Sequence, residues 1–426
     1  MDLEEHLFRH ESGRLVSILT RLFGIQNLSL AEDVVQDAFC RALETWKLHG
    51  VPKNPTAWLV TTAKRRALDV LRREGTARKF EPEVAQVLGS EWTRATAINE
   101  AFEPGGLNDA QLRMMFSCVH PTLPEETQVA LILNLLCGFS VAETAAAFLK
   151  SSVAMEKRIV RAKKTLAETK NLFELKNAAD VKIRLLAVQR AIYLLFNEGY
   201  HSASTTMVVR VDLCEEALRL IYLLLEHSLT KTPSVHALAA LLNFHAARLP
   251  GRVDAQGNLT SLFEQDRTLW NRDHIAEGHR QLELSAAGAE LTAFHVESAI
   301  AAEHASAARA ADTNWENIAS LYDVLMRIQP TPVVALNRAI AIAEIEGPAR
   351  ALEEVEGIDG REKLECYPFY FAALGEFEYR LGQMANACGL FAKAQELARN
   401  ESERRFLRER MHRCRCDCAD GSSRID

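Results

Sequence analysis

The stretch KSSVAMEKRIVRAKKTLAETK, residues 150–170, carries five Lys and two Arg against two Glu. A second stretch, TTAKRRALDVLRREGTARKF at residues 61–80, carries five Arg and two Lys against one Asp and one Glu. Each stretch has a net charge of +5, although the whole chain has a net charge of −7. Phosphate backbones attract concentrated Lys and Arg through the release of counterions. The two stretches therefore predict contact with nucleic acid in a protein that is acidic overall.

The residues around position 150 predict a helix-turn-helix. A helix is expected from Pro124 to Gly138, and the capping box Ser140-Val141-Ala142-Glu143 begins a short second helix. Ser152 is the expected N-cap of a basic third helix over residues 153–169, in the position typical of a DNA reader. Four of its residues can face one groove and two more suit phosphates: Ala154, Lys157, Arg158 and Arg161, then Lys163 and Lys164. The alternative is a pair of ordinary solvated helices with charged faces.

The basic stretch at 61–80 follows an amphipathic helix. Ser29-Leu30-Ala31-Glu32 is a second capping box, and the helix AEDVVQDAFCRALETW (31–46) then leaves four polar residues on its exposed side: Asp33, Gln36, Asp37 and Arg41. After a turn at 49–55, a helix is expected from Thr56 to Glu74. Its mixture of Trp58 with threonines and basic residues suits unstacked bases. The alternative is a core tryptophan beside a solvated basic face.

The rest of the chain predicts an all-α protein with several domains. Residues 1–76 and 109–170 form two helical units, joined by a linker at 77–108 that contains Pro104-Gly105-Gly106. From 180 to 411 the chain is a run of amphipathic helices. Gly347 and Gly382 lie 35 residues apart, a period that fits tetratricopeptide-type helical hairpins.

Composition restricts the functional classes. The N-terminal segment is charged, and the longest apolar stretch, 129–142, is too short to span a bilayer, so we expect a cytoplasmic protein without a membrane partner. Charged residues gather in GNLTSLFEQDRTLW (257–270), but without a nucleophile, a metal-ligand pattern or a Gly-rich loop we expect no enzyme, no cofactor and no catalytic residue. FNEGY (196–200) could hold a ligand, although a buried turn is the simpler interpretation.

The nine cysteines predict no disulfide framework. Six are isolated and are expected to be small buried hydrophobic side chains. Cys414, Cys416 and Cys418 fall in residues 412–426, which we expect to be a flexible, reduced tail and not a metal site. The role of these three thiols is left open by the sequence.

The two basic units resemble regions 2 and 4 of sigma-70-type factors of the extracytoplasmic-function class. The residues that carry the resemblance are AEDVVQDAFCRALETW, NPTAWLVTTAKRRALDVLRRE and LPEETQVALILNLLCGFSVAETAAAFL with RIVRAKKTL, within about 10–76 and 109–168. FNEGY (196–200), GNLTSLFEQDRTLWNRDHIAEG (257–278) and TPVVALNRAIAIAEIEGPARAL (331–352) resemble the subgroup with a long tetratricopeptide-like C-terminal extension. The resemblance spans nearly the whole chain.

The resemblance implies partners and site residues. Core RNA polymerase would bind through its β′ clamp helices and its β subunit, with Asp33, Gln36, Asp37 and Arg41 on the β′ contact. The second implied partner is promoter DNA, and the melted −10 element would contact Lys53, Asn54, Trp58, Thr62, Arg65 and Arg66. The helix 153–169 would read the −35 duplex. The repeat region would regulate these activities, and solenoid surfaces of this kind can bind a protein or peptide ligand.

Two other classes of protein are alternatives to a sigma factor. One is a helical-repeat adaptor whose helix-turn-helix acts as a conventional DNA-binding regulator; such a protein would not need both helices 31–46 and 56–74. The other is a metal-dependent enzyme, for which the sequence offers no site. The sequence does not reveal the promoter sequence, the inducing signal or the direction of regulation.

Overall fold

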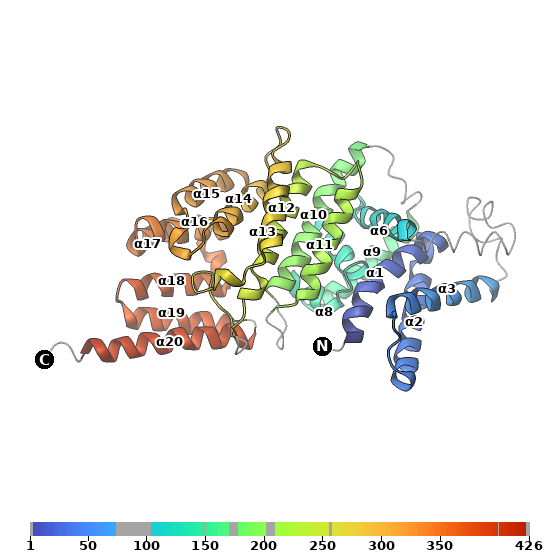
Figure 1. The fold of residues 1–426 in the computed structure, drawn as a ribbon, viewed down its shortest axis with the longest axis horizontal. Helices are drawn as coiled ribbons and strands as arrows, with labels where there is room; N and C mark the ends of the chain where they lie inside the picture. Colours follow the sequence, from blue (N-terminus) through green and yellow to red (C-terminus); the bar gives the residue numbers. More distant parts are fainter. Residues whose placement is uncertain are drawn as a thin grey trace. The chain divides into compact units, whose positions relative to one another are not determined.

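The computed structural model describes residues 3–73, 104–148, 150–169, 178–201, 209–254, 258–398 and 400–422. Within these ranges the prediction of an all-α fold is confirmed, since the only β pairing is an isolated bridge between Val253 and Leu259. The chain divides into two compact units: residues 1–196 with 215–230, and residues 197–214 with 231–426 (Figure 1). Each unit is described by itself.

The first unit begins with three helices: α1 (Leu3–Phe23), α2 (Leu28–His49) and α3 (Pro55–Arg73). Helix α2 begins directly after the 3-10 turn Ile25–Asn27, so the predicted capping box at Ser29–Glu32 is wrong because both residues lie inside the helix. The Asn54 side chain accepts a hydrogen bond from the Ala57 amide at 3.0 Å and caps α3. An edge-to-face contact between Trp46 and Trp58, with ring centroids 5.5 Å apart, packs α3 on α2.

Four further helices complete the helix-turn-helix region: α6 (Pro104–Cys118), α7 (Glu125–Leu135), α8 (Val141–Ala147) and α9 (Ser152–Glu168). The predicted capping box between Ser140 and Glu143 is confirmed at the start of α8. Ser151, and not Ser152, caps α9 by accepting from the Ala154 amide. Pro104 opens α6 instead of belonging to a break, because a proline is well suited to the first turn of a helix. Residues 77–103 of the expected linker lie outside the described residues, as does Leu149.

The units predicted at 1–76 and 109–170 pack together. Helix α1 lies against α6 and α7. At Gly13 the approach is so close that an added Cβ would lie 2.0 Å from the carbonyl oxygen of Leu136. Only a glycine allows this approach. The expected two separate domains therefore share one core around the buried side chains of Leu15, Leu19 and Phe116.

Two helices that the sequence placed in the repeat region also contribute to the first unit. They are α10 (Ala178–Tyr200) and α11 (Val211–Glu226), and most of each belongs to this unit. The guanidinium of Arg219 on α11 donates to the buried side chain of Gln111 on α6 at 2.9 Å. Arg184 of α10 donates to the backbone oxygen of Phe116 at 3.3 Å. The structural division therefore falls inside α10 and α11, and not at the expected residue 180.

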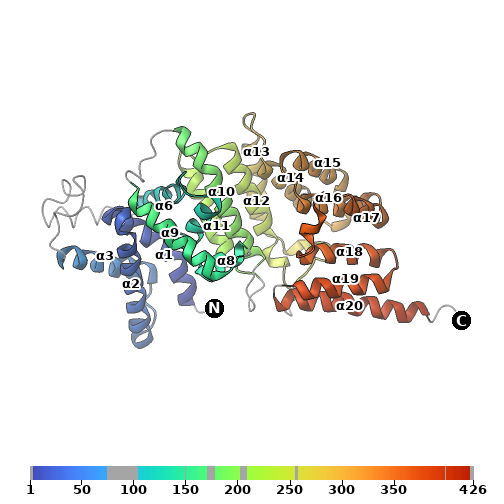
Figure 2. The ribbon, with the colours of Figure 1, turned by 180° about the vertical axis from the view of Figure 1, so that it is seen from behind.

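The second unit is a succession of antiparallel helices, visible from both sides in Figures 1 and 2. They are α12 (Pro233–Ala247), α13 (Arg272–Ser285), α14 (Ala293–Ser306), α15 (Trp315–Ile328), α16 (Pro332–Ile345), α17 (Pro348–Glu356), α18 (Pro368–Arg380), α19 (Met384–Leu397) and α20 (Glu401–Ser422). Gly347 separates α16 from α17 and Gly382 separates α18 from α19, with φ angles of +92° and +78°. These two glycines sit where the 35-residue spacing predicted hairpin turns, because few other residues adopt positive φ.

Helix α20 corrects the expectation of a flexible tail for residues 412–422, whereas residues 423–426 of that expected tail lie outside the described residues. It extends to Ser422 and packs along α19. Cys414 lies in the core of this helix pair and is 1% exposed. Of the six isolated cysteines, Cys118, Cys137 and Cys214 are buried as expected, whereas Cys388 is half-buried and Cys40 and Cys366 are exposed. No helix in the described ranges has both the length and the apolar character needed to cross a membrane.

Candidate nucleic-acid and polymerase interface

Helix α9 presents a basic face to solvent. Ala154, Lys157, Arg161 and Lys164 are exposed, whereas the opposite face buries Met155, Ile159, Ala162 and Leu166. Val153 and Val160 are also on the exposed side, at 62% and 60% exposure. A mixture of cations and apolar groups suits a major groove, where guanidinium groups bind guanine and apolar groups contact thymine methyls. Sequence analysis missed the two valines because apolar residues are usually assigned to the core.

Two predicted DNA contacts on α9 are engaged within the protein. The amino group of Lys163 lies 2.6 Å from a carboxylate oxygen of Glu32 on α2. Arg158 forms an ion pair with Glu126 at the start of α7, and Lys150 lies 3.4 Å from the same carboxylate. Hydrogen bonding from Arg158 and the nearby positive charges hold the pKa of Glu126 below its usual range. These two cations are thus occupied by acidic side chains before any phosphate arrives.

Helix α2 presents the polar face that its pattern predicted. Asp33, Gln36 and Arg41 are exposed, and Leu43, 47% exposed, continues the row of Asp33 and Gln36 at helical spacing. Ala42, and not Leu43, belongs to the buried stripe of α2. An exposed leucine among polar groups is typical of a surface that another protein covers.

Asp37 lies at the junction of α2 and α3. The guanidinium of Arg66 donates to one Asp37 oxygen through Nε at 2.8 Å and approaches it through a second nitrogen at 2.6 Å. The side chains of Asp37 and Arg66 are 47% and 25% exposed. The neighbouring Arg65 is exposed. The structure therefore separates two arginines that the sequence treated alike: Arg66 joins helices, and Arg65 projects to solvent.

The remaining residues predicted for the −10 strand lie at the start of α3. Lys53 and Asn54 are exposed, although the Asn54 side chain caps the helix. Trp58 is half-buried against Trp46, and Thr62 is partly exposed one turn later. All six predicted residues therefore lie on the loop 50–54 or on α3. Sequence patterns did not indicate the contacts that Glu32, Glu126 and Gly13 make within the first unit.

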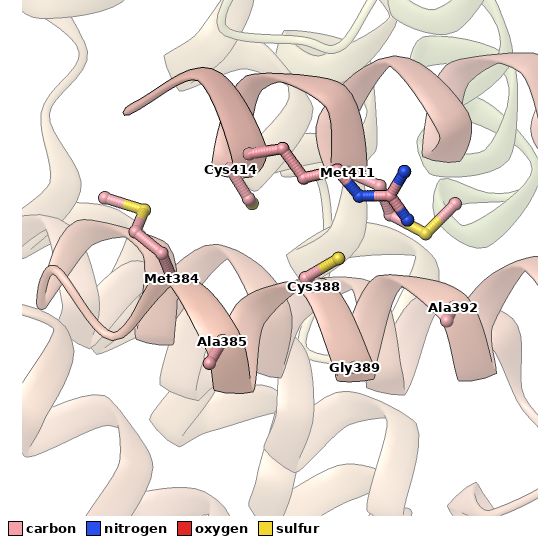
Figure 3. Close-up of a pocket in the computed structure, with 8 residues that line it drawn as sticks. Met384, Ala385, Cys388, Gly389, Ala392, Met411 and Cys414 are labelled. Carbon is pink, nitrogen blue, oxygen red and sulfur yellow. The ribbon is translucent and has the colours of Figure 1, made fainter. Parts of the chain in front are cut away.

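Cys414 and Cys416 do not face the same side of α20. Residues two apart on a helix face nearly opposite sides. Cys414 accordingly points inward, while Cys416 is exposed and lies 3.5 Å from the Nδ1 atom of His412. Figure 3 shows Cys388 of α19 and Cys414 of α20 at a cavity of about 460 Å³ that Met384 and Met411 also line. Among the described residues, no three His, Cys, Asp or Glu side chains form a group that could hold a metal.

Comparison with known proteins matches this arrangement. The family model for sigma-70 region 2 matches residues 7–76, and that for sigma-70 region 4 matches residues 113–166. Residues 184–286 match a family of unknown function, DUF6596. An all-α chain with both sigma regions and a basic helix-turn-helix defines a sigma factor, and the chain belongs to the sigma-70 family, in a form like the extracytoplasmic-function class with a C-terminal extension.

One relative shares the whole arrangement. An uncharacterized protein from Rhizobium meliloti (strain 1021) is 39% identical over 383 residues, covering 90% of this chain and 89% of the relative. The similarity therefore includes the C-terminal helices together with the sigma regions.

Proposed function

We propose that this sigma factor binds core RNA polymerase through the exposed face of α2 and directs promoter recognition, melting and transcription initiation. Asp33, Gln36 and Arg41 project from that face, and Leu43 adds apolar area at its edge. The β′ clamp helices are the proposed binding surface on the polymerase, with further contacts to the β subunit. The observation that carries this proposal is the presence of both sigma regions in one folded unit. A conventional regulator would have no use for the first region.

The −10 element is assigned to α3 and its preceding loop. Arg65 and Lys53 are exposed beside the half-buried ring of Trp58, so this surface combines positive charge with an aromatic group. Unstacking bases costs a few kcal/mol per step. Contacts that form only with an exposed strand favour the melted state by differential binding. This is how a protein without bond chemistry can drive promoter opening.

The −35 element is assigned to the exposed face of α9. Lys157 and Arg161 form no ion pair with another described residue and face solvent, so we assign them to base edges and phosphates. Lys163 and Arg158 must exchange Glu32 and Glu126 for phosphate oxygens, which makes DNA binding compete with contacts inside the protein. The first unit is therefore proposed to open when it engages a promoter.

Regulation is assigned to the C-terminal helices. Helices α10 and α11 contact the region 4 helices through Arg184, Arg190 and Arg219, which pair with Phe116, Glu125 and Gln111 respectively. Any rearrangement of these two helices would alter the surface on which region 4 is packed. A protein or peptide ligand of the tetratricopeptide-like helices and a cytoplasmic location, where RNA polymerase works, complete the proposal.

Transcription from genomic DNA tests this function without knowledge of the promoter. Core polymerase reconstituted with the full chain is run on genomic fragments, and the 5′ ends of the transcripts are sequenced. The expected result is a set of start sites that share two spaced motifs, absent with core polymerase alone. Start sites indistinguishable from those of core polymerase alone would contradict the proposal.

A further inference from the structure

Three arginines of the second unit lie around the same two aromatic rings, and two of them are buried. Arg248 and Arg252 flank the 3-10 turn Leu249–Gly251, and Arg267 begins the next 3-10 turn. Arg252 and Arg267 are 7% and 6% exposed, and Arg248 is partly exposed. Their described hydrogen-bond partners include no carboxylate; they are the side chains of Gln265, His201 and Thr313 and the backbone oxygens of His304 and Ala307. Burying a cation without a counterion costs several kcal/mol.

The three guanidinium groups lie against two aromatic rings. The Cζ atom of Arg252 lies 4.0 Å from the ring centroid of Tyr200, and that of Arg248 lies 5.9 Å from the same centroid. The Cζ atoms of Arg248 and Arg267 lie 5.6 and 5.0 Å from the ring centroid of Trp270. Such cation–π contacts are weakly favourable. They orient the cations but do not neutralise them.

The surrounding titratable groups do not supply the missing charge. Burial, reinforced by the nearby arginines, lowers the pKa values of His245 and His304 to about 3, so both are neutral at pH 7. Asp312 influences Arg267, but its two oxygens accept from Arg309 at 2.8 and 2.9 Å. Arg267 itself donates to two backbone oxygens at the C-terminal end of α14, a favourable place for a cation. The uncompensated charge is therefore that of Arg248 and Arg252.

We propose that Arg248 and Arg252 bind a small phosphate-bearing anion beside Tyr200 and Trp270. Two guanidinium groups match the double negative charge of a phosphate, and their fork geometry suits phosphate oxygens. Two buried donors near them, Arg252 Nε and Trp270 Nε1, have no hydrogen-bond partner among the described residues. Partial exposure of Arg248 gives a small solute access.

The site joins two sequence segments that the sigma functions leave unused. Tyr200 ends FNEGY, and Arg267 and Trp270 end GNLTSLFEQDRTLW. Gly251 is buried against Trp270, and a Cβ there would lie 3.2 Å from the indole nitrogen. All of these residues fall within 184–286, the span matched by the family of unknown function. The proposed ligand site thus lies apart from the residues assigned to polymerase and promoter binding.

Binding is tested with pyrophosphate and inorganic phosphate on the full-length protein at constant ionic strength. Calorimetry is expected to show saturable binding with one anion per chain, and thermal unfolding is expected to shift upward because the ligand binds the folded state. Arg248→Met should weaken binding at least tenfold. It should also raise the melting temperature without ligand, because it removes a partly buried charge that has no carboxylate partner among the described residues. Arg280→Met, which removes an exposed guanidinium group that pairs with Glu277, is the matched control and should bind like the unaltered protein.

Several results would overturn the proposal. Equal thermal shifts in all three proteins would identify a general salt effect, and tighter binding of citrate than of pyrophosphate would exclude the phosphate assignment. If Arg248→Met does not fold, Arg248→Lys is tested in its place, because lysine keeps the positive charge but lacks the forked donor geometry of the guanidinium group. Binding by that variant as tight as by the unaltered protein would contradict the site, and at least tenfold weaker binding would support it.

Discussion

The amino group of Lys163 on α9 lies 2.6 Å from a carboxylate oxygen of Glu32 on α2. A residue proposed to contact promoter phosphates is thus held by the helix proposed to bind polymerase. The two side chains are 23% and 31% exposed, so solvent screens the pair and its contribution is modest. The relationship nevertheless makes DNA binding and the packing of the first unit competing events.

Glu32→Gln should release Lys163 and strengthen binding of the full chain to duplex DNA about twofold to fivefold, the range expected for a partly exposed ion pair. Fluorescence anisotropy at low salt measures this. The same substitution in a Lys163→Met background should have no effect. A Lys164→Met background provides the control, because the described partner of Lys164 is Glu168 in its own helix. If Glu32→Gln strengthens binding equally in a Lys163→Met background, the two residues are not coupled.

Gly13→Ala should destabilise the first unit although alanine favours a helix. The new Cβ would lie 2.0 Å from the Leu136 carbonyl oxygen, so α1 and α7 must separate, at a cost of about 1–3 kcal/mol or more. Gly389→Ala in α19 is the matched control, because nothing lies within 4 Å of its Cβ position, and it should stabilise by about 0.5–1 kcal/mol. Urea unfolding of both variants gives the comparison. A Gly13→Ala protein as stable as the Gly389→Ala protein would refute the close approach.

Arg65 and Arg66 should differ in their effects on transcription. Arg65→Ala removes an exposed charge and is expected to reduce open complexes more than closed complexes, with no change in thermal stability. Arg66→Ala breaks the pair with Asp37 between α3 and α2 and should lower both complexes and the melting temperature. Permanganate footprinting reports the melted strand, and gel shift reports total binding. Identical behaviour of the two variants would show that α3 is oriented differently.

The second unit should lose stability in acid because of its buried histidines. The pKa of His245 falls from 6.5 to about 3 in the folded state, chiefly through burial. Below pH 6.5 the unfolded chain therefore binds a proton at His245 that the folded chain does not bind. The contribution of His245 to the free energy of unfolding is complete above pH 6.5 and declines as the pH falls toward 3. His245→Asn should flatten the fall in melting temperature between pH 6.5 and 4.5, measured in phosphate-free buffer.

A second titratable group, Glu297, also changes the stability of the protein with pH, so the pH profiles of the unaltered protein and of His245→Asn must be compared. Burial raises the pKa of Glu297 to about 7, so its contribution to stability declines as the pH rises from 4.5 through 7, the opposite trend. Because Glu297 is present in both proteins, the difference between them isolates His245. Parallel pH profiles for the two proteins would mean that His245 is not buried in a neutral form.

Thiol labelling distinguishes an ordered α20 from a flexible tail. Cys416 is exposed and Cys414 is 1% exposed, so a maleimide should modify Cys416 much faster in the folded protein. Mass spectrometry of digested samples measures both rates, and labelling in urea provides the reference in which they converge. Equal rates without urea would restore the expectation of a disordered tail.

The sequence was most informative where local chemistry fixes the backbone. Gly347 and Gly382 mark real turns because few other residues adopt positive φ, and Ser140 with Glu143 forms a real capping box. The same motif failed at Ser29–Glu32 because the 3-10 turn before it lets α2 begin at Leu28. Local motifs compete with tertiary context, and the context decides which of them is used.

Contacts between distant residues could not be predicted. Glu32 and Lys163 are 131 residues apart, and nothing in either neighbourhood indicates that they meet. The tail expectation failed for a related reason, since the polar composition of 412–422 concealed one inward face occupied by Cys414. Arg248, Arg252 and Arg267 likewise form a cluster only because the turns at 249–251 and 267–269 lie close together in the second unit.

The central claim is that this chain is a sigma factor that works through core RNA polymerase. The most direct test is binding of the full-length protein to purified core polymerase in competition with the housekeeping sigma factor, compared with an Asp33→Ala, Gln36→Ala, Arg41→Ala variant of the exposed α2 face. We expect the unaltered chain to displace the housekeeping factor and the triple variant to do so at least tenfold less well. Failure of the unaltered chain to bind core polymerase at micromolar concentration would contradict the account.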